Sequence, residues 1–214
     1  MDCVLEVIFC GDVNCVVCGG ETLEDSSLCR SCSVKIKECF DFSIINYNKK
    51  QIKCYSASYY SKVIMELIIR LKYKKDFKSA EILASLMLKT IRRGCIKGDY
   101  IAFVPISKAS LKKRGYNQSM LLGKIISKET GIEIIDVLKK SKDAKDQIGL
   151  SRKERLENIK NSFEFKGNTN IKNKNIILVD DVFTTGATAF WCVDILIKNG
   201  AKDVKVLTAA KSKV

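Results

Sequence analysis

The chain has 214 residues, of which 46% are hydrophobic, so it can bury a core as one sizeable domain or as one domain with a small module. It contains no histidine, which excludes nucleophilic triads that use histidine and every zinc site that needs an imidazole ligand. Its formal net charge of +14 favours polyanionic partners, such as phosphorylated metabolites or nucleic acid, although lysines that only solvate the surface would give the same total.

No apolar run approaches the roughly 18 residues that span a membrane. The start of the chain, Met1-Asp2-Cys3, lacks the basic region of a secretory signal. We therefore expect a cytoplasmic protein without a membrane span. Disulfides are rare in that reducing compartment, so clustered cysteines among the ten in the chain indicate a metal site.

Near its start the chain carries two Cys-x2-Cys pairs separated by ten residues, at Cys15, Cys18, Cys29 and Cys32. Four thiolates form the tetrahedral set of a structural zinc ion, with no position left open for catalysis. A module of about 40 residues buries too little surface to fold alone, so the metal would supply folding energy. Cys10 and Cys39 lie nearby, and either could replace one of the four ligands.

The sequence divides into three predicted parts: a zinc-binding module (1–42), a linker with an edge strand (43–60) and the main domain (61–214). Apolar residues at helical spacing predict helices over 62–71, 78–93, 107–128 and 187–199, the first capped by Ser61 and the third with a break risk at Gly115. Short apolar runs predict strands over 54–59, 100–104, 132–137, 176–179 and 204–208. Because strands alternate with helices, we expect an α/β fold with a doubly wound parallel sheet.

The apolar run 176–179 leads into Asp180 and Asp181 and then into a loop that opens a helix. A continuous apolar run fits a strand buried on both faces, and open α/β sheets bind ligands where such strands end. The two acids would repel a phosphate, but they can accept hydrogen bonds from the vicinal hydroxyls of a ribose. The loop suits the 5-phosphate because it offers N–H groups, hydroxyls and a helix N-terminus: Val182, Phe183, Thr184, Thr185, Gly186, Ala187 and Thr188. An ordinary strand–turn–helix is the plainer alternative, but one capping aspartate would suffice for it.

Two further segments carry groups that suit a pyrophosphate. Ile106, Ser107 and Lys108 follow a predicted strand and open a helix, which describes either a second anion-binding loop or a plain connection. Arg114 begins the cluster Arg-Gly-Tyr-Asn-Gln and could pair with phosphate oxygens. The alternative for this cluster is a solvated turn with Tyr116 packed inward.

A later charged segment, 139–158, carries Arg152 and Arg155 on one helical face. A basic loop beside a phosphate site can close over a leaving group and exclude water. The alternative is an exposed helix with internal salt bridges, since Glu154 and Glu157 are interleaved with the arginines.

In chain order these segments resemble the ComF family over nearly the whole sequence: the cysteine pairs, Arg70-Leu71-Lys72-Tyr73, Val104-Pro105-Ile106-Ser107, Arg114-Gly115-Tyr116-Asn117-Gln118, the segment 147–158, and the segment 179–188. The last of these by itself resembles the phosphoribosyl-pyrophosphate motif of type I phosphoribosyltransferases. The departures are the extra cysteines and a single proline where the family often has a second. The resemblance implies a type I phosphoribosyltransferase fold with an amino-terminal zinc finger and a role in DNA uptake during natural competence. It also implies single-stranded DNA and a competence helicase as candidate partners.

Two functions follow from these residues. In the first, the protein is a phosphoribosyltransferase of unspecified acceptor, and Mg²⁺ bridges the pyrophosphate and ribose oxygens of phosphoribosyl pyrophosphate. Asp180 and Asp181 would hold the ribose hydroxyls, and Arg114, with cations of the two neighbouring segments, would stabilise the departing pyrophosphate. In the second, the same fold is a non-catalytic module that binds the phosphosugar or single-stranded DNA within the uptake machinery.

Overall fold

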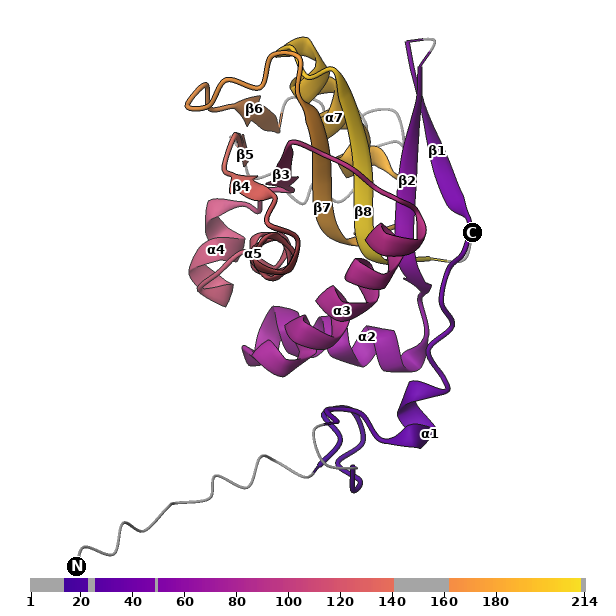
Figure 1. Ribbon diagram of the computed structural model, residues 1–214. Helices are drawn as coiled ribbons and strands as arrows, with labels where there is room; N and C mark the ends of the chain where they lie inside the picture. The colour runs from indigo at the N-terminus through magenta and orange to yellow at the C-terminus, as the bar shows by residue number, and fades with distance from the viewer. Residues whose placement is uncertain (1–13, 23–25, 49, 141–161, 213–214) are drawn as a thin grey trace, which may run out of the picture.

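The computed structural model describes residues 14–22, 26–48, 50–140 and 162–212 (Figure 1). Its centre is a six-stranded sheet with the order β1-β2-β8-β7-β3-β4. The strands of this sheet are β1 (Phe42–Tyr47), β2 (Lys50–Tyr59), β3 (Tyr100–Phe103), β4 (Glu133–Ile135), β7 (Asn175–Phe183) and β8 (Asp203–Lys211). All neighbours pair in parallel except β1 and β2, which form an antiparallel hairpin. A small second sheet joins β5 (Leu138–Lys140) and β6 (Phe163–Phe165).

Helices cover both faces of the sheet, as the doubly wound prediction requires. The helical elements are α1 (Arg30–Ser33), α2 (Lys62–Ile69), the π-helix η1 (Arg70–Lys74), α3 (Phe77–Arg93), α4 (Lys108–Arg114), α5 (Gln118–Thr130) and α7 (Ala187–Lys198). One buried core lies between the sheet and α2, α3 and α5, and it includes Ile177 and Val179 of β7. A second core lies under α7 and includes Ile176 and Leu178 of the same strand. The alternation along β7 therefore confirms a strand buried on both faces.

Local sequence signals placed most helix ends correctly. The hydroxyl of Ser61 accepts a hydrogen bond from the Ile64 N–H, which confirms the predicted cap of α2. The predicted helix 107–128 does break at Gly115, which ends α4 in the left-handed region (φ +84°). None of the helices in the described ranges is long and apolar enough to cross a bilayer.

Three features differ from the sequence-based expectation. The strand predicted over 54–59 belongs to β2, which lies inside the sheet, because β1 adds one more strand and takes the edge. Strand β7 does not stop at residue 179 but pairs with β8 as far as Phe183, so both aspartates lie within it. The predicted helix 62–71 changes at Arg70 into the π-helix η1. The division of the chain at residues 42 and 60 stays a prediction.

Candidate functional site

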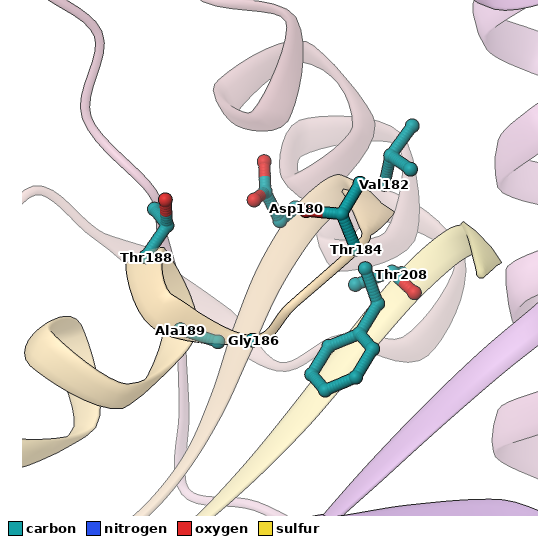
Figure 2. A pocket seen from close by; sticks show the side chains of 8 residues that line it. Asp180, Val182, Thr184, Gly186, Thr188, Ala189 and Thr208 are labelled. Carbon is teal, nitrogen blue, oxygen red and sulfur yellow. The ribbon is translucent and has the colours of Figure 1, made fainter. Parts of the chain in front are cut away.

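A pocket lies at the carboxyl edge of the sheet, where β7 ends (Figure 2). It is open to solvent, and its empty space, which includes solvent at its mouth, is about 260 Å³. Its lining consists of Asp180, Val182, Phe183, Thr184, Gly186, Thr188, Ala189 and Thr208. Thr185 and Ala187 belong to the same loop but are not part of this lining.

Asp180 presents a fixed carboxylate to this pocket. The Ser119 hydroxyl donates to Asp180 Oδ1 at 2.8 Å, and the Asp181 N–H donates to the same oxygen at 2.9 Å. Ser119 is fully buried in the first turn of α5, so its hydroxyl is itself held in place. Burial, followed by the charge of Asp181, raises the pKa of Asp180 above its ordinary value, although one side of the residue faces the pocket.

Asp181 has a different environment, because adjacent residues of a strand point to opposite faces of the sheet. It is 5% exposed and forms an ion pair with the ammonium of Lys72, which follows α2 in the π-helix η1. The sequence-based expectation assigned both acids to one sugar. Of the two, the structure brings Asp180 to the pocket and turns Asp181 away from it.

The loop that connects β7 to α7 depends on glycine. Gly186 has a φ of +76°, and a Cβ at this position would lie 2.9 Å from Phe183 Cζ. Both the backbone conformation and the packed ring therefore favour glycine. The N-cap of α7, Gly186, has no side chain to cap the helix, and the Ala187 N–H contacts the Thr185 hydroxyl only at 3.5 Å, so the first turn of the helix can still donate to an anion. Thr184 and Thr185 are exposed beside them.

The second predicted anion loop lies at the same edge of the sheet, since the Val104 N–H donates to the Val179 carbonyl at 3.0 Å. Ser107 is the N-cap of α4, and its hydroxyl accepts from the Ser110 N–H at 3.1 Å. Ile106 is partly buried and Lys108 is exposed. These three residues do not line the pocket, and their role in anion binding stays a prediction.

The Arg-Gly-Tyr-Asn-Gln cluster forms the turn between α4 and α5. Tyr116 packs inward against the core, as the alternative interpretation of this cluster predicted. Asn117 Nδ2 donates to the Val104 carbonyl at 2.9 Å and so ties the turn to the end of β3. Sequence reasoning missed Asn117 and Ser119 as residues that shape the site. An asparagine directly before a helix was the available signal, because it is a preferred N-cap.

Arg114 lies beside this turn and not in the pocket lining. It donates to Gln118 Oε1 at 2.9 Å, and its guanidinium lies 5.3 Å from the centre of the Tyr73 ring. Its proposed contact with pyrophosphate stays a prediction. Arg152 and Arg155 lie outside the described residues.

A separate cluster joins the four predicted zinc ligands. The sulfur atoms of Cys15, Cys18, Cys29 and Cys32 all lie within 4.8 Å of one another. The Cys15 N–H donates to the Gly20 carbonyl at 2.7 Å, which closes the turn of the first pair, and the second pair brackets the start of α1. A hydrogen bond with Ser31 lowers the pKa of Cys29 to about 6 and favours the thiolate that metals bind. These four residues could therefore hold a metal ion.

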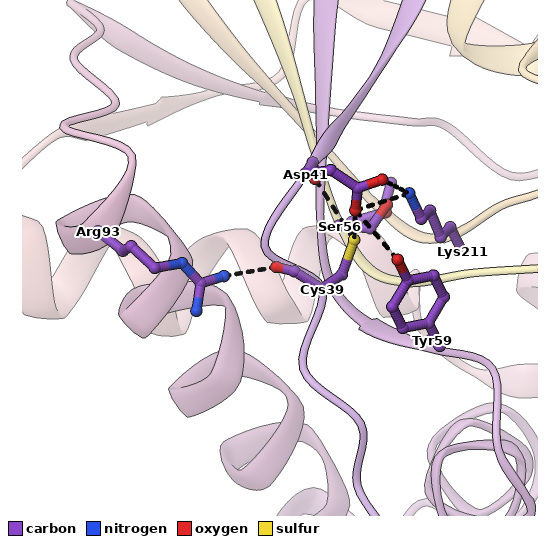
Figure 3. Close-up of polar contacts among 7 residues, drawn as sticks. Cys39, Asp41, Ser56, Tyr59, Arg93 and Lys211 are labelled. Carbon is purple, nitrogen blue, oxygen red and sulfur yellow. Dashed lines mark hydrogen bonds and ion pairs between the residues drawn. The ribbon is translucent and has the colours of Figure 1, made fainter.

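Cys39 is not part of that cluster. Its thiol donates to Asp41 Oδ1 at 2.9 Å, and the same oxygen accepts from the Tyr59 hydroxyl and the Lys211 ammonium, each at 3.1 Å (Figure 3). Cys39 thus links the end of the cysteine module to the carboxyl ends of β2 and β8. Cys10, the other alternative ligand, lies outside the described residues.

A parallel sheet with an acid and a hydroxyl-rich loop at one carboxyl end defines a class, that of the phosphoribosyl transferase domains. Residues 78–213 match the family described as "Phosphoribosyl transferase domain", and the chain belongs to it. It is similar to "Competence protein F" of Haemophilus influenzae (28% identical, covering 92% of this chain and 84% of that protein) and to "Competence protein ComFC" of Streptococcus pneumoniae (28%, 94% and 82%). It is also similar to "DNA utilization protein YhgH" of Salmonella typhi (31%, 71% and 68%). These relatives confirm the resemblance to the ComF family.

Proposed function

We propose that this protein binds phosphoribosyl pyrophosphate with Mg²⁺ at the carboxyl end of β7 and that it serves DNA uptake in natural competence. The observation that carries the proposal is one pocket shared by Asp180 and the loop 184–188. An acid suits the ribose hydroxyls, and a loop at a helix N-terminus suits the 5-phosphate. The link to DNA uptake rests on the relatives named competence protein F and ComFC. Transfer of the pentose to an acceptor would make the protein an enzyme that releases pyrophosphate.

Each side chain has a distinct role in this proposal. Asp180 accepts hydrogen bonds from the sugar, while the hydroxyls of Thr184 and Thr188 and the N–H groups of their loop donate to the 5-phosphate. Lys108 and Arg114 belong to α4, which starts at the same edge of the sheet, and they attract the pyrophosphate. Because this pocket has no histidine to shuttle protons, positioning and charge do most of the work.

The donor atoms fit both proposed metals. Mg²⁺ is usually held by one or two carboxylates together with substrate phosphates, and Asp180 supplies a carboxylate in the pocket. When bound, Mg²⁺ would neutralise charge on the pyrophosphate. Zinc bound by four thiolates at about 2.3 Å needs sulfur separations of about 3.8 Å. The four cysteines approach this arrangement, with all sulfurs within 4.8 Å, so we propose a structural zinc ion there.

Replacing Asp180→Asn should weaken the binding of phosphoribosyl pyrophosphate about tenfold or more without lowering thermal stability. An asparagine amide has one acceptor oxygen where a carboxylate has two, so it accepts fewer hydrogen bonds from the ribose hydroxyls. Thermal stability should not fall, because the substitution also removes an acid from a largely buried position. Calorimetry in the presence of Mg²⁺ measures the affinity. Because the pKa of Asp180 is raised, the affinity of the wild type should increase with pH as the carboxylate ionises, and the variant should lose this contribution.

Asp203→Asn is the matched control for this experiment. Asp203 begins β8 at the opposite edge of the sheet and pairs with Lys205 at 3.2 Å. It should bind phosphoribosyl pyrophosphate as the wild type does. Equal affinities of the wild type and the Asp180→Asn variant would reject the proposed function.

A second candidate function, the binding of single-stranded DNA, is favoured by one exposed surface. We call it the Tyr73 surface; it consists of Tyr73, Phe77, Lys113 and Arg114. Tyr73 is 58% exposed and Phe77 is 56% exposed. The Lys113 ammonium lies 6.0 Å from the centre of the Tyr73 ring. Exposed rings beside cations are what proteins use to stack bases and contact phosphates of single strands.

Tyr73→Ala should weaken binding of a fluorescent oligothymidine by about 1–3 kcal/mol, the usual contribution of one base stacked on a ring. Lys113→Ala should instead reduce the dependence on salt, by a slope of about 0.7 on a double-logarithmic plot. Anisotropy titrations at several salt concentrations measure both. Tyr60→Ala, which removes a 39% exposed tyrosine elsewhere, should change neither. Binding that is indifferent to salt would contradict this second function.

A further inference from the structure

The two adjacent aspartates of β7 are alike in sequence but not in surroundings. The register with β8 pairs Asp180 with Thr208, and the alternation that places Val179 against α2, α3 and α5 places Asp181 on that same face of β7. A regular strand must send neighbouring side chains to opposite faces. Asp180 therefore reaches the pocket, and Asp181 reaches the helical layer on the other side.

Asp181 is closed off from the ligand side. Its Oδ2 is buried, and this oxygen is the atom that the Lys72 ammonium contacts. Its partner is the ammonium of Lys72, whose side chain is 22% exposed. Burying a carboxylate costs much free energy unless a counter-charge is nearby. The ion pair with Lys72 therefore offsets the cost of burying Asp181.

Lys72 reaches Asp181 from an unusual element. It lies in the π-helix η1, which ends at Lys75 in the left-handed region with a φ of +53°. Short π-helices are rare and often occur at functional sites. The hydroxyl of Tyr116 donates to the carbonyl of Leu71 and thereby fixes η1 to the turn between α4 and α5.

The same turn also holds the other aspartate. Ser119, at the start of α5, donates to Asp180 Oδ1, and Asn117 caps that helix by accepting from the Ser119 N–H at 2.8 Å. The contacts of Asp180 and Asp181 therefore belong to one framework that joins β7, η1 and the α4–α5 turn. We therefore expect a substitution at Lys72 to alter the position of the Asp180 carboxylate through these contacts.

We propose that Lys72 and Asp181 are a positioning pair behind the phosphosugar site and that Asp180 alone of the two acids contacts the sugar. This inference rests on the proposed function. Lys72 neutralises Asp181, so that two carboxylates can follow each other in one strand. The pair also anchors the end of β7 and keeps Asp180 directed into the pocket.

A double-mutant cycle tests the division of roles. Lys72→Met leaves a buried carboxylate unpaired, and it should lower both the melting temperature and the affinity for phosphoribosyl pyrophosphate, the latter about tenfold. The double variant Lys72→Met/Asp181→Asn has no charge left to compensate. It should regain the melting temperature and bind within about twofold of the wild type, which shows as strong coupling between the two sites. Calorimetry with Mg²⁺ and thermal melts without ligand give the two readouts.

Lys198→Met is the matched control, since Lys198 also pairs with a largely buried aspartate, Asp194, at 2.9 Å. It lies at the far end of α7, about 14 Å along the helix axis from Ala189 of the pocket lining. It should leave the affinity unchanged.

The outcomes separate the two proposals. If the Asp181→Asn variant and the double variant both bind about tenfold or more weakly while the double variant is stable, Asp181 touches the ligand and the division of roles is overturned. If Asp180→Asn binds as well as the wild type, the proposed function itself falls. Recovery of both readouts in the double variant, with Asp180→Asn still impaired, supports the positioning pair.

Discussion

Gly186→Ala is expected to reduce the affinity for phosphoribosyl pyrophosphate by about tenfold or more, or about 1.4 kcal/mol, and to destabilise the fold as well. The φ of +76° alone disfavours any side chain, at about 1–2 kcal/mol. The new Cβ would also lie 2.9 Å from Phe183 Cζ, so the ring that lines the pocket must move. Both effects disturb the loop that would hold the 5-phosphate. Calorimetry and thermal melts measure the two losses.

Gly131→Ala separates the two causes. Gly131 ends α5 with a similar φ of +73°, but a Cβ there would meet nothing within 4 Å. It should show the backbone cost alone, about 1–2 kcal/mol, with unchanged affinity. A Gly186→Ala variant that is no more impaired than Gly131→Ala would contradict the role assigned to the loop.

Replacing Cys32→Ser is expected to remove bound metal and to release the amino-terminal module from its packing. Cys32 is 4% exposed, and together with Cys15 it is part of the core that contains α2 and α3. A site of four thiolates contributes about 10–16 kcal/mol, far more than so short a segment gains from burial. Elemental analysis should find one zinc ion per wild-type chain and none per variant chain. Limited proteolysis should cleave the variant faster within the module.

Cys95→Ser is the control, because Cys95 is exposed and does not belong to the four-cysteine cluster. It should keep its zinc and its resistance to protease. A strong chelator should reproduce the Cys32→Ser result on the wild type. A Cys32→Ser protein that retains one tightly bound zinc ion would contradict the assignment of the ligands.

Local patterns were enough to predict the fold class and much of the site. The run 176–179 is buried on both faces, and the loop after β7 opens α7 as its residues indicate. The spacing of the cysteine pairs predicted a cluster that the structure forms. These features depend on neighbours in sequence, which is why single-sequence reasoning reaches them.

Features set by distant partners were not predictable. The strand predicted over 54–59 was expected at the edge of the sheet, yet β1 takes the edge and the strand pairs with β8 inside the sheet. The π-helix depends on Tyr116 and Asp181, which lie far along the chain from Leu71 and Lys72. No periodicity within 62–74 contains that information.

By itself the sequence determined the α/β class, most helices and strands of the main domain, the cysteine pairs and the loop beside two acids, because propensity and spacing act over a few residues. The tertiary structure decided which acid faces the pocket and which is paired with Lys72. That decision follows from how far β7 stays paired with β8, since the pleat of an extended strand sends Asp180 and Asp181 to opposite faces.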